Sequence, residues 1–310
     1  MKVFIAGHRG LVGSALVRNA PKSYELITID REKLDLLDKD AVNDFLKFIK
    51  PDVVILAAAK VGGIYANSKF QKDFLLRNLE IQDSVIDSAA NNRIPKLIFL
   101  GSSCIYPKNA PQPISENSLL TGPLEPTNEG YAIAKIAGIK LCKAISQEMN
   151  LNYFSLMPTN LYGQNDNYDL DTSHVPAALM RRFHEAKLKK YSRVEIWGTG
   201  SPRREFMHVD DMASATWHMV EIGAPGELIN VGTGTDVTIK DFAKLMASIV
   251  GFEGEISFDN SKPDGTPRKL LDVNKIHALG WTHKIELREG LTQTYKWFNH
   301  AIEIGEIRGL

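Results

Sequence analysis

Cysteine is scarce in this chain: 310 residues contain two, Cys104 and Cys142. Two thiols without metal-ligand spacing predict neither a disulfide scaffold nor a zinc module, and they are typical of a reducing compartment. No apolar run reaches the roughly 18 residues that a bilayer-spanning helix needs. The first apolar run is also too short for a secretory leader. We therefore expect a cytoplasmic protein without a membrane partner.

Neither sign of charge is in excess. The 37 Lys and Arg residues balance the 37 Asp and Glu residues, which argues against a general nucleic-acid binder. Eight cations gather within residues 181–204, against Glu185 and Glu195. This basic stretch is short and lacks interleaved aromatic residues, so we expect no nucleic-acid partner. A solvated helix face is the plainer interpretation of Lys187, Lys189 and Lys190.

Short apolar runs alternate with helical patterns over the first 160 residues. The runs do not alternate polar with apolar residues, which predicts strands buried on both faces. Strand and helix in turn predict an α/β fold with a doubly wound parallel sheet. The expected strands cover residues 3–6, 26–29, 53–57, 97–100 and 153–157. The expected helices cover residues 11–19, 39–49, 72–91 and 131–150.

A polar loop at residues 161–175 precedes a second α/β half. We predict a dinucleotide-binding Rossmann domain of residues 1–165 and 206–235, and a smaller substrate domain of residues 166–205 and 236–310. The site is expected between them. Further helices are expected at 176–187, 210–222 and 239–250 and after 272 and 286, with strands at 194–197, 228–231 and 255–258.

A glycine-rich turn lies between the first predicted strand and helix. It reads Gly7-His8-Arg9-Gly10-Leu11-Val12-Gly13. Glycines at this spacing let the backbone approach a pyrophosphate, and the helix N-terminus supplies N–H donors. A plain glycine-rich turn is the alternative, but the position in the first βα unit favours a dinucleotide.

The end of the second strand should select the cofactor. Asp30 there is typical of an NAD-type ribose contact, whereas Arg31 suits a 2′-phosphate. Arg9 is a second basic candidate, so we favour NADP (NADPH). Asp35 and the adjoining Leu36 are candidate adenine-side contacts, with a helix N-cap as the alternative for Asp35.

A Tyr131-x-x-x-Lys135 pair is predicted on one helix face. A lysine ammonium beside a phenol should lower the pKa of the tyrosine, and such a tyrosine can protonate a carbonyl oxygen. Ser102 follows a predicted strand, at the sheet edge where ligands bind. If that strand persists, Cys104 points the same way as Ser102. Cys142 lies on an apolar helical stripe and should be core.

These motifs together resemble the extended short-chain dehydrogenase/reductases. Longer strings resemble, almost end to end, the GDP-L-fucose synthases, which are NADPH-dependent 3,5-epimerases and 4-reductases of GDP-4-keto-6-deoxy-D-mannose. The strings are Ala57-Ala58-Ala59-Lys60-Val61-Gly62-Gly63-Ile64, Gly101-Ser102-Ser103-Cys104-Ile105-Tyr106-Pro107, Met157-Pro158-Thr159-Asn160-Leu161-Tyr162-Gly163, Arg204-Glu205-Phe206, His208-Val209-Asp210-Asp211 and Lys262-Pro263-Asp264-Gly265-Thr266-Pro267-Arg268-Lys269.

The resemblance implies roles for individual residues. The catalytic set would be Ser102, Tyr131 and Lys135, with Cys104 as epimerisation base and His174 as acid. It also implies a GDP-sugar substrate and a homodimer. The implied substrate contacts are Arg182, Trp197, Arg204 and Asp264. Besides the glycine-rich turn, the implied cofactor contacts are Arg31, Leu100, Gly101, Ser102, Ser103, Tyr131, Lys135, Pro158, Thr159, Asn160, Leu161 and His174.

Several alternatives remain open on the sequence. Cys104 alone could be a small buried hydrophobe, His174 a capping or surface residue, and Trp197 a core residue. The histidines show no metal spacing, so we expect no metal. A related reductase or epimerase of another GDP-4-keto sugar, such as a 6-deoxy-heptose, fits the same motifs. A catalytically idle dinucleotide-binding scaffold is disfavoured by the intact Ser102, Tyr131 and Lys135.

Overall fold

A six-stranded parallel sheet forms the centre of the larger lobe. The computed structural model describes residues 1–262 and 264–310. The strand order β2-β1-β3-β4-β5-β10 reverses between β1 and β3, and every neighbouring pair is parallel. This confirms the predicted doubly wound α/β sheet, with each of the six strands within one or two residues of its expected bounds. The strands are β1 (Lys2–Ala6), β2 (Glu25–Ile27), β3 (Val53–Leu56), β4 (Lys96–Leu100), β5 (Asn152–Pro158) and β10 (Leu228–Val231).

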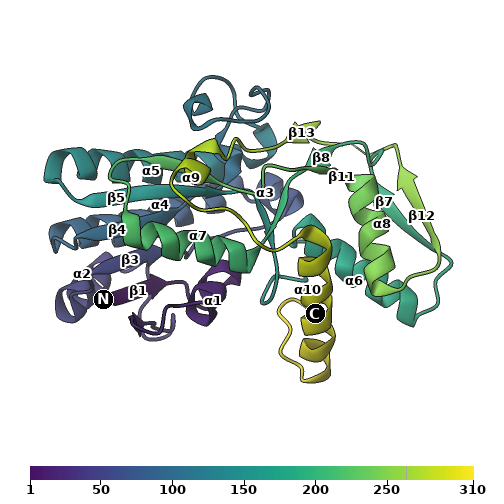
Figure 1. Ribbon diagram of the computed structural model, residues 1–310, viewed down its shortest axis with the longest axis horizontal. Coiled ribbons are helices and arrows are strands. Elements are labelled where there is room, and N and C mark those ends of the chain that lie inside the picture. The colour runs from purple at the N-terminus through teal and green to yellow at the C-terminus, as the bar shows by residue number, and fades with distance from the viewer. Residues whose placement is uncertain (263) are drawn as a thin grey trace.

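Helices cover both faces of the sheet because its strands are apolar on both sides. On one face α2 packs against α4 and α4 against α5, while α1 packs against α7 on the other (Figure 1). Cys142 of α5 is buried in this core, as its position on an apolar stripe predicted. The helices are α1 (Leu11–Arg18), α2 (Lys39–Ile49), α4 (Gln71–Asn91), α5 (Glu129–Met149) and α7 (Val209–Ile222).

A smaller lobe lies beside the sheet and contains its own apolar cluster. Phe183, Phe242 and Phe298 are fully buried in that cluster. Its elements are α6 (Val175–Leu188), β7 (Arg193–Trp197), α8 (Ile239–Val250), β12 (Glu255–Asp259) and α10 (Leu287–Glu303). The sequence also predicted these elements to within about two residues. Figure 1 shows the lobe on the right, with the C-terminus drawn over α10.

Short elements that the sequence did not predict join the two lobes. They are α3 (Ile64–Lys69), β6 (Asn160–Tyr162), β8 (Arg203–Arg204), β9 (Phe206–His208), β11 (Val237–Thr238), β13 (Arg268–Lys269) and a 3-10 turn at Ser103–Ile105. β6 pairs with β9, and β8 pairs with both β11 and β13. Elements of two to six residues are too short to leave a clear periodic pattern in a sequence, which explains why they were missed.

The domain boundaries stay a prediction. Leu271, Val273 and Ile276 belong to the apolar cluster of the large sheet, although they fall in the predicted substrate segment 236–310. The helix α9 (Asn274–Ala278) likewise packs beside β10. The chain therefore returns to the first lobe once more than the sequence division allowed.

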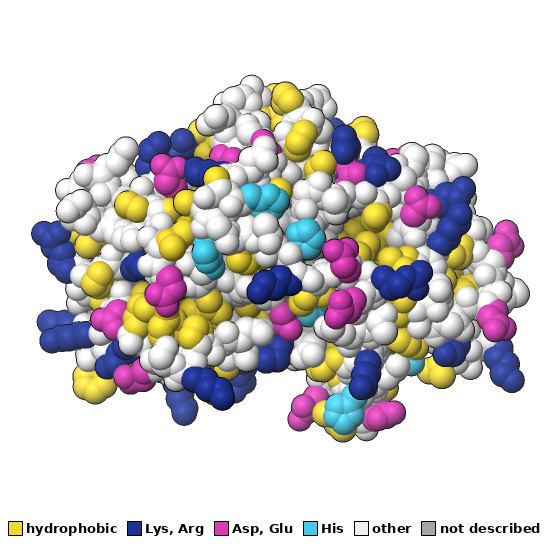
Figure 2. Space-filling model, in the orientation of Figure 1, with side chains coloured by type: hydrophobic (Ala, Val, Ile, Leu, Met, Phe, Trp, Pro, Cys, Tyr) yellow, Lys and Arg dark blue, Asp and Glu magenta, His cyan; other side chains and the backbone are white. Residues whose placement is uncertain are grey.

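Charges of both signs are mixed on the visible face of the molecule (Figure 2). Part of the basic stretch is locally paired, with Glu185 contacting Arg181 and Lys189, and Asp236 contacting Arg203. Among the described residues, no helix is long and apolar enough to cross a membrane.

Candidate active site

The glycine-rich turn is shaped for a group that needs close backbone approach. Gly7 has φ +93°, and a Cβ atom there would lie 2.6 Å from the Ala58 nitrogen. A Cβ atom on Gly13 would lie 2.0 Å from the Gly7 carbonyl oxygen. Gly10 is the N-cap residue of α1. Because it has no side chain to hydrogen-bond the first amides of the helix, the helix N-terminus is accessible to an anion. These features fit a pyrophosphate and leave no space for larger residues.

Basic and acidic groups meet at the end of β2. Arg9 Nη2 lies 2.7 Å from Asp30 Oδ1, and His8 Nε2 lies 3.3 Å from the same oxygen. Arg31 pairs with Asp35 at 3.5 Å. Asp35 also accepts a hydrogen bond from the Leu37 amide, but the N-cap of α2 is Asp38. The N-cap alternative for Asp35 is therefore wrong, and Leu36 lies in the same turn.

The tyrosine and lysine lie on the first two turns of α5. Lys135 Nζ is buried and donates to the Leu100 carbonyl oxygen at 2.9 Å, which ties α5 to the end of β4. The same nitrogen lies 5.8 Å from the centre of the Tyr131 ring. Phe74 of α4 packs edge-on against that ring from another side. The predicted pair therefore faces the carboxyl end of the sheet.

The expected effect of Lys135 on Tyr131 is wrong. Burial raises the pKa of Tyr131, and the neighbouring Cys104 raises it further. Burial also lowers the pKa of Lys135 to about 8. Lys135 therefore keeps most of its charge at pH 7, but the loss of hydration of the buried phenolate outweighs the attraction of that ammonium group. Tyr131 is therefore held as a neutral phenol, which is the form that donates a proton.

Ser102 and Cys104 meet by a different route from the one predicted. The strand ends at Leu100, and the 3-10 turn begins at Ser103, so the alternation of a strand does not carry Cys104 to the Ser102 face. Ser102 instead caps this turn, and its Oγ accepts from the Cys104 amide at 3.4 Å. Burial raises the pKa of the Cys104 thiol, while Lys269, the Ser102 hydroxyl and Lys135 act to lower it.

His174 occupies the junction between the polar loop and α6. It is the N-cap residue of that helix, and its side chain is exposed. Loss of hydration of the imidazolium near the surrounding protein lowers the pKa of His174, and the positive charge of Lys269 lowers it further. Lys269 of β13 thus interacts electrostatically with both Cys104 and His174. The side chain of Lys269 is itself enclosed, and burial lowers its pKa.

Glu205 is a buried residue that contacts the segment Pro158–Leu161, which the sequence predicts to bind the cofactor. Its carbonyl accepts from Thr159 Oγ1 and Asn160 Nδ2. Its carboxylate accepts from the amides of Thr233, Gly234 and Leu271. Glu205 therefore joins the segment Pro158–Leu161 to β13, the strand that carries Lys269. The sequence offered Glu205 and Lys269 only as members of matching strings, without a role.

Three of the four predicted substrate residues come together on the smaller lobe. Asp264 accepts from the Thr199 amide at 2.7 Å, directly after Trp197 at the end of β7. Arg204 interacts electrostatically with Asp264, and burial lowers its pKa. Trp197 is 64% exposed, so the core alternative is wrong. Arg182 lies separately, exposed on α6.

The acid loop, residues 166–174, contains a second buried carboxylate. Burial raises the pKa of Asp166 to about 7, against the Asn167 amide and Arg308, which lower it. Between about pH 4 and pH 7 the folded protein keeps this proton while the unfolded chain has lost it. The folded state then binds more protons, so the free energy of unfolding falls as the pH rises through this window.

We therefore expect Asp166→Asn to flatten the pH dependence of stability. The wild-type slope attributable to Asp166 is about 1.4 kcal/mol per pH unit, and an asparagine cannot ionise. The variant should gain stability relative to wild type as the pH rises from about 4 to about 7, as measured by urea unfolding. Asp171→Asn, an exposed carboxylate of the same loop, is the control and should leave the slope unchanged. Parallel curves for wild type and Asp166→Asn would contradict the raised pKa of Asp166.

Metal ligands were not expected, and among the residues that the structure describes no cluster of three or more His, Cys, Asp or Glu side chains is placed to hold an ion.

Sequence comparison places the chain in a known family of proteins. Residues 3–232 match the model of the NAD dependent epimerase/dehydratase family. The chain is 56% identical to the putative GDP-L-fucose synthase 2 of Arabidopsis thaliana, over 96% of this chain and 91% of that protein. It is 53% identical to the GDP-L-fucose synthase of Escherichia coli, over 96% of both.

A solved structure resembles the whole fold. The GDP-mannoheptose C4 reductase of Campylobacter jejuni, solved with NADP bound, has a TM-score of 0.87 and 38% identity, over 96% of this chain and 98% of that one. The motifs, the sheet and the relatives agree. The chain belongs to the NAD dependent epimerase/dehydratase family and, within it, to the GDP-L-fucose synthases.

Proposed function

We propose that this enzyme converts GDP-4-keto-6-deoxy-D-mannose into GDP-L-fucose, by epimerisation at C3 and C5 and reduction at C4 with NADPH. The observation that carries the proposal is the gathering of a neutral phenol, a thiol and a lysine at the carboxyl end of β4, with Lys269 linking the thiol to His174. A plain reductase needs the phenol and lysine alone. The thiol and imidazole add a second acid–base pair.

Reduction uses Tyr131 as the proton donor. The glycine-rich turn would hold NADPH, which would supply the hydride for C4 when bound. Tyr131 gives its proton to the C4 oxygen as negative charge develops there, and Ser102 donates a hydrogen bond to the same oxygen. The raised pKa of Tyr131 keeps the phenol protonated at neutral pH. Lys135 donates a hydrogen bond to the Leu100 carbonyl oxygen and so fixes the face of α5 that carries Tyr131.

Epimerisation uses Cys104 as base and His174 as acid. The C4 ketone acidifies the hydrogens on C3 and C5, and Tyr131 with Ser102 holds the enolate oxygen. Cys104 removes a proton from one face of the sugar, and His174 returns one to the other face. The positive charge of Lys269 stabilises the Cys104 thiolate. The same charge destabilises the protonated form of His174.

The pH dependence of the exchange step follows from these directions. The pKa of Cys104 is raised and that of His174 is lowered, so the dominant form near neutral pH is a neutral thiol with a neutral imidazole. The form that reacts is a thiolate with an imidazolium, which is a minor form that carries the same number of protons. Its population is constant between the two pKa values. We therefore expect wild-type deuterium exchange at C3 and C5 to be flat through neutral pH and to fall only once the pH drops below the lowered pKa of His174.

His174→Gln is the diagnostic variant for that pairing. Its residual exchange depends on the thiolate alone, so the rate should rise with pH, about tenfold per pH unit, as far as the thiol pKa. NMR deuterium incorporation measured from pH 6 to pH 9 decides the point. Parallel profiles for the two proteins would show that His174 takes no part in the proton transfer.

The basic residues at the end of β2 support a preference for NADPH. Asp30, the one NAD-type feature, is engaged by Arg9 and His8 and acts here to orient the Arg9 guanidinium. Arg9 and Arg31 remain more than two-thirds exposed, so both are accessible to a phosphate. We propose that they bind the 2′-phosphate, with the glycine-rich turn, Asp35, Leu36, Leu100–Ser103 and Pro158–Leu161 holding the rest of the cofactor.

Each Arg→Ala change at Arg9 or Arg31 should raise the KM for NADPH far more than that for NADH. Loss of a charge-assisted phosphate contact costs about 1.5–3 kcal/mol, or roughly tenfold to a hundredfold. Arg288→Ala, an exposed arginine of α10, is the control. Equal losses with both cofactors would indicate that Asp30 binds the ribose in the NAD manner.

A reductase or epimerase of another GDP-4-keto sugar is the second candidate, because a GDP-mannoheptose C4 reductase shares the fold at 38% identity. Trp197, Arg204, Asp264 and Arg182 are proposed to bind the GDP-sugar in either case. Product analysis by NMR, with NADPH and each keto sugar in turn, separates them. Efficient turnover of a heptose with none of the deoxymannose would overturn the main proposal.

We also propose a cytoplasmic homodimer. Leu76 of α4 and Ile133 of α5 are each more than 40% exposed on two helices that pack side by side. Apolar side chains so placed favour burial against a second copy across a two-fold axis. Both cysteines are free thiols, as a reducing compartment requires.

A further inference from the structure

The C-terminal segment contacts the loop that ends at His174. Residues 306–310 follow α10 and are called the strap here. The Arg308 carbonyl accepts from the Tyr168 amide at 2.9 Å. Gly309 has φ +85°, and a Cβ atom there would lie 2.5 Å from both Asn167 Oδ1 and the Asp169 nitrogen. At Gly309 the strap therefore lies so close to the acid loop that only glycine fits at that position.

Arg181 binds the strap and the loop to α6. Its Nη1 donates to the Tyr168 carbonyl and to the Gly309 carbonyl, each at 2.8 Å. Its Nε donates to Glu185 at 2.7 Å. The side chain is 16% exposed, so these bonds are largely shielded from water. Arg181 is separate from the proposed substrate contact Arg182, although the two are neighbours in sequence.

The far side of the acid loop is fixed to the Rossmann lobe. Asp169 accepts from Thr172 through both its amide and its hydroxyl, which closes the loop on itself. The Thr172 carbonyl then accepts from the Gly63 amide at 2.8 Å. The loop is therefore held between the strap on one side and the segment after β3 on the other, and His174 follows directly.

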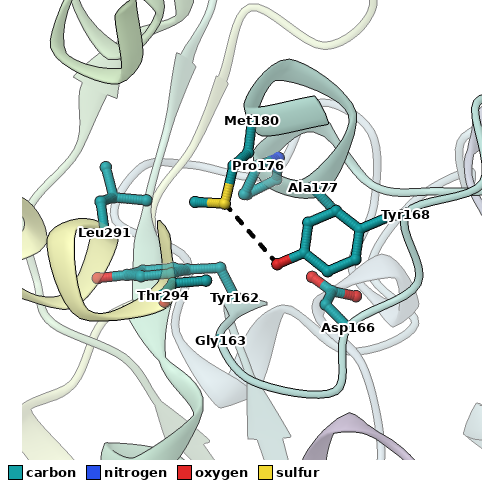
Figure 3. Close-up of a pocket in the computed structure, with 9 residues that line it drawn as sticks. All are labelled: Tyr162, Gly163, Asp166, Tyr168, Pro176, Ala177, Met180, Leu291 and Thr294. Atoms are coloured by element: carbon teal, nitrogen blue, oxygen red, sulfur yellow. Dashed lines mark hydrogen bonds between the residues drawn. The ribbon is translucent and has the colours of Figure 1, made fainter. Parts of the chain in front are cut away.

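Beneath the loop, Tyr168 anchors it to the smaller lobe. Its ring is buried 4.6 Å from the ring centre of Phe298 in α10, and its hydroxyl donates to the Met180 sulfur of α6 at 3.8 Å. Figure 3 shows the hydroxyl aimed at this sulfur, with Asp166 beside the ring. A residue that donates its amide to the strap is therefore also embedded in the junction of α6 and α10.

We propose that the strap and Arg181 are positioning elements for His174, holding the acid at the distance and angle that proton return requires. This rests on the proposed function of His174. The physical reason is that an acid on a loose loop samples many poses, and small misplacements of a reacting group cost large factors in rate. The strap and Arg181 are not placed among the groups that contact substrate.

Gly309→Ala tests the proposal, with Gly305→Ala as its matched control. Both glycines have positive φ, but a Cβ atom on Gly305 meets nothing within 4 Å among the described atoms. We expect Gly309→Ala to lower C3 and C5 deuterium exchange in the presence of NADP⁺ by about tenfold or more, with unchanged NADPH affinity. Gly305→Ala should retain wild-type exchange. Arg181→Leu should behave like Gly309→Ala, and Arg181→Lys should restore part of the rate.

The decisive comparison is made in the His174→Gln background. If the strap acts through His174, adding Gly309→Ala to His174→Gln should cause no further loss of exchange. An equal fold-loss in both backgrounds, or full exchange by Gly309→Ala alone, would overturn the proposal. A second measurement does not depend on catalysis: Gly309→Ala should reduce amide hydrogen protection at residues 166–174 and leave β1 to β5 unchanged. Unaltered amide protection at residues 166–174 would overturn the positioning proposal, whether or not the wild-type enzyme exchanges C3 and C5 hydrogens. Absence of that exchange in the wild-type enzyme would instead refute the proposed epimerase function.

Discussion

Tyr131→Phe is expected to retain NADPH binding and to lose reduction by about two to four orders of magnitude. A phenyl ring fills the same space between Phe74 and Lys135, but it neither donates a proton nor stabilises an oxyanion. Stopped-flow turnover gives the rate, and energy transfer from tryptophan to the cofactor gives the affinity.

Tyr106→Phe provides the control for removal of a buried hydroxyl. Tyr106 Oη donates to the Asn230 side chain, beyond the proposed chemistry, so this variant should lose stability and keep its rate per folded molecule. Near wild-type reduction by Tyr131→Phe would show that the Tyr131 and Lys135 spacing is accidental.

The second large effect is expected for Cys104→Ser. The change is nearly isosteric in a buried position, so the fold and NADPH binding should persist. An alcohol is a far weaker base than a thiol with even a small thiolate fraction. Deuterium exchange at C3 and C5 in the presence of NADP⁺ should therefore fall by about two orders of magnitude or more.

Cys142→Ser separates base chemistry from sulfur loss. Cys142 is also buried but lies in the apolar core beneath α5, so its serine variant should keep wild-type exchange per folded molecule. Full exchange by Cys104→Ser would remove this thiol as the base and would direct attention to Lys269, which interacts electrostatically with both Cys104 and His174.

The sequence was sufficient for the parts of the site that are contiguous in the chain. The glycine-rich turn and the Tyr131–Lys135 pair each occupy one βα junction or one helix face, so local spacing defines their geometry. Apolar runs likewise predicted all six strands of the central sheet, because burial on both faces leaves an unbroken signal.

Groups assembled from distant segments were beyond sequence reasoning. Lys269 reaches Cys104 and His174 only because β13 pairs with β8, and Glu205 holds that arrangement with three backbone amides. Neither residue carries a local signal of its role. The pKa of Tyr131 was predicted in the wrong direction for a related reason, since burial depends on packing that spacing does not report.

The central claim is that one site both inverts C3 and C5 and reduces C4. The most direct test is NMR analysis of the product formed by the wild-type enzyme from GDP-4-keto-6-deoxy-D-mannose and NADPH in D₂O. The account predicts GDP-L-fucose with deuterium at both C3 and C5. A reduced GDP-sugar that keeps the D-configuration and carries no deuterium at these carbons would contradict it.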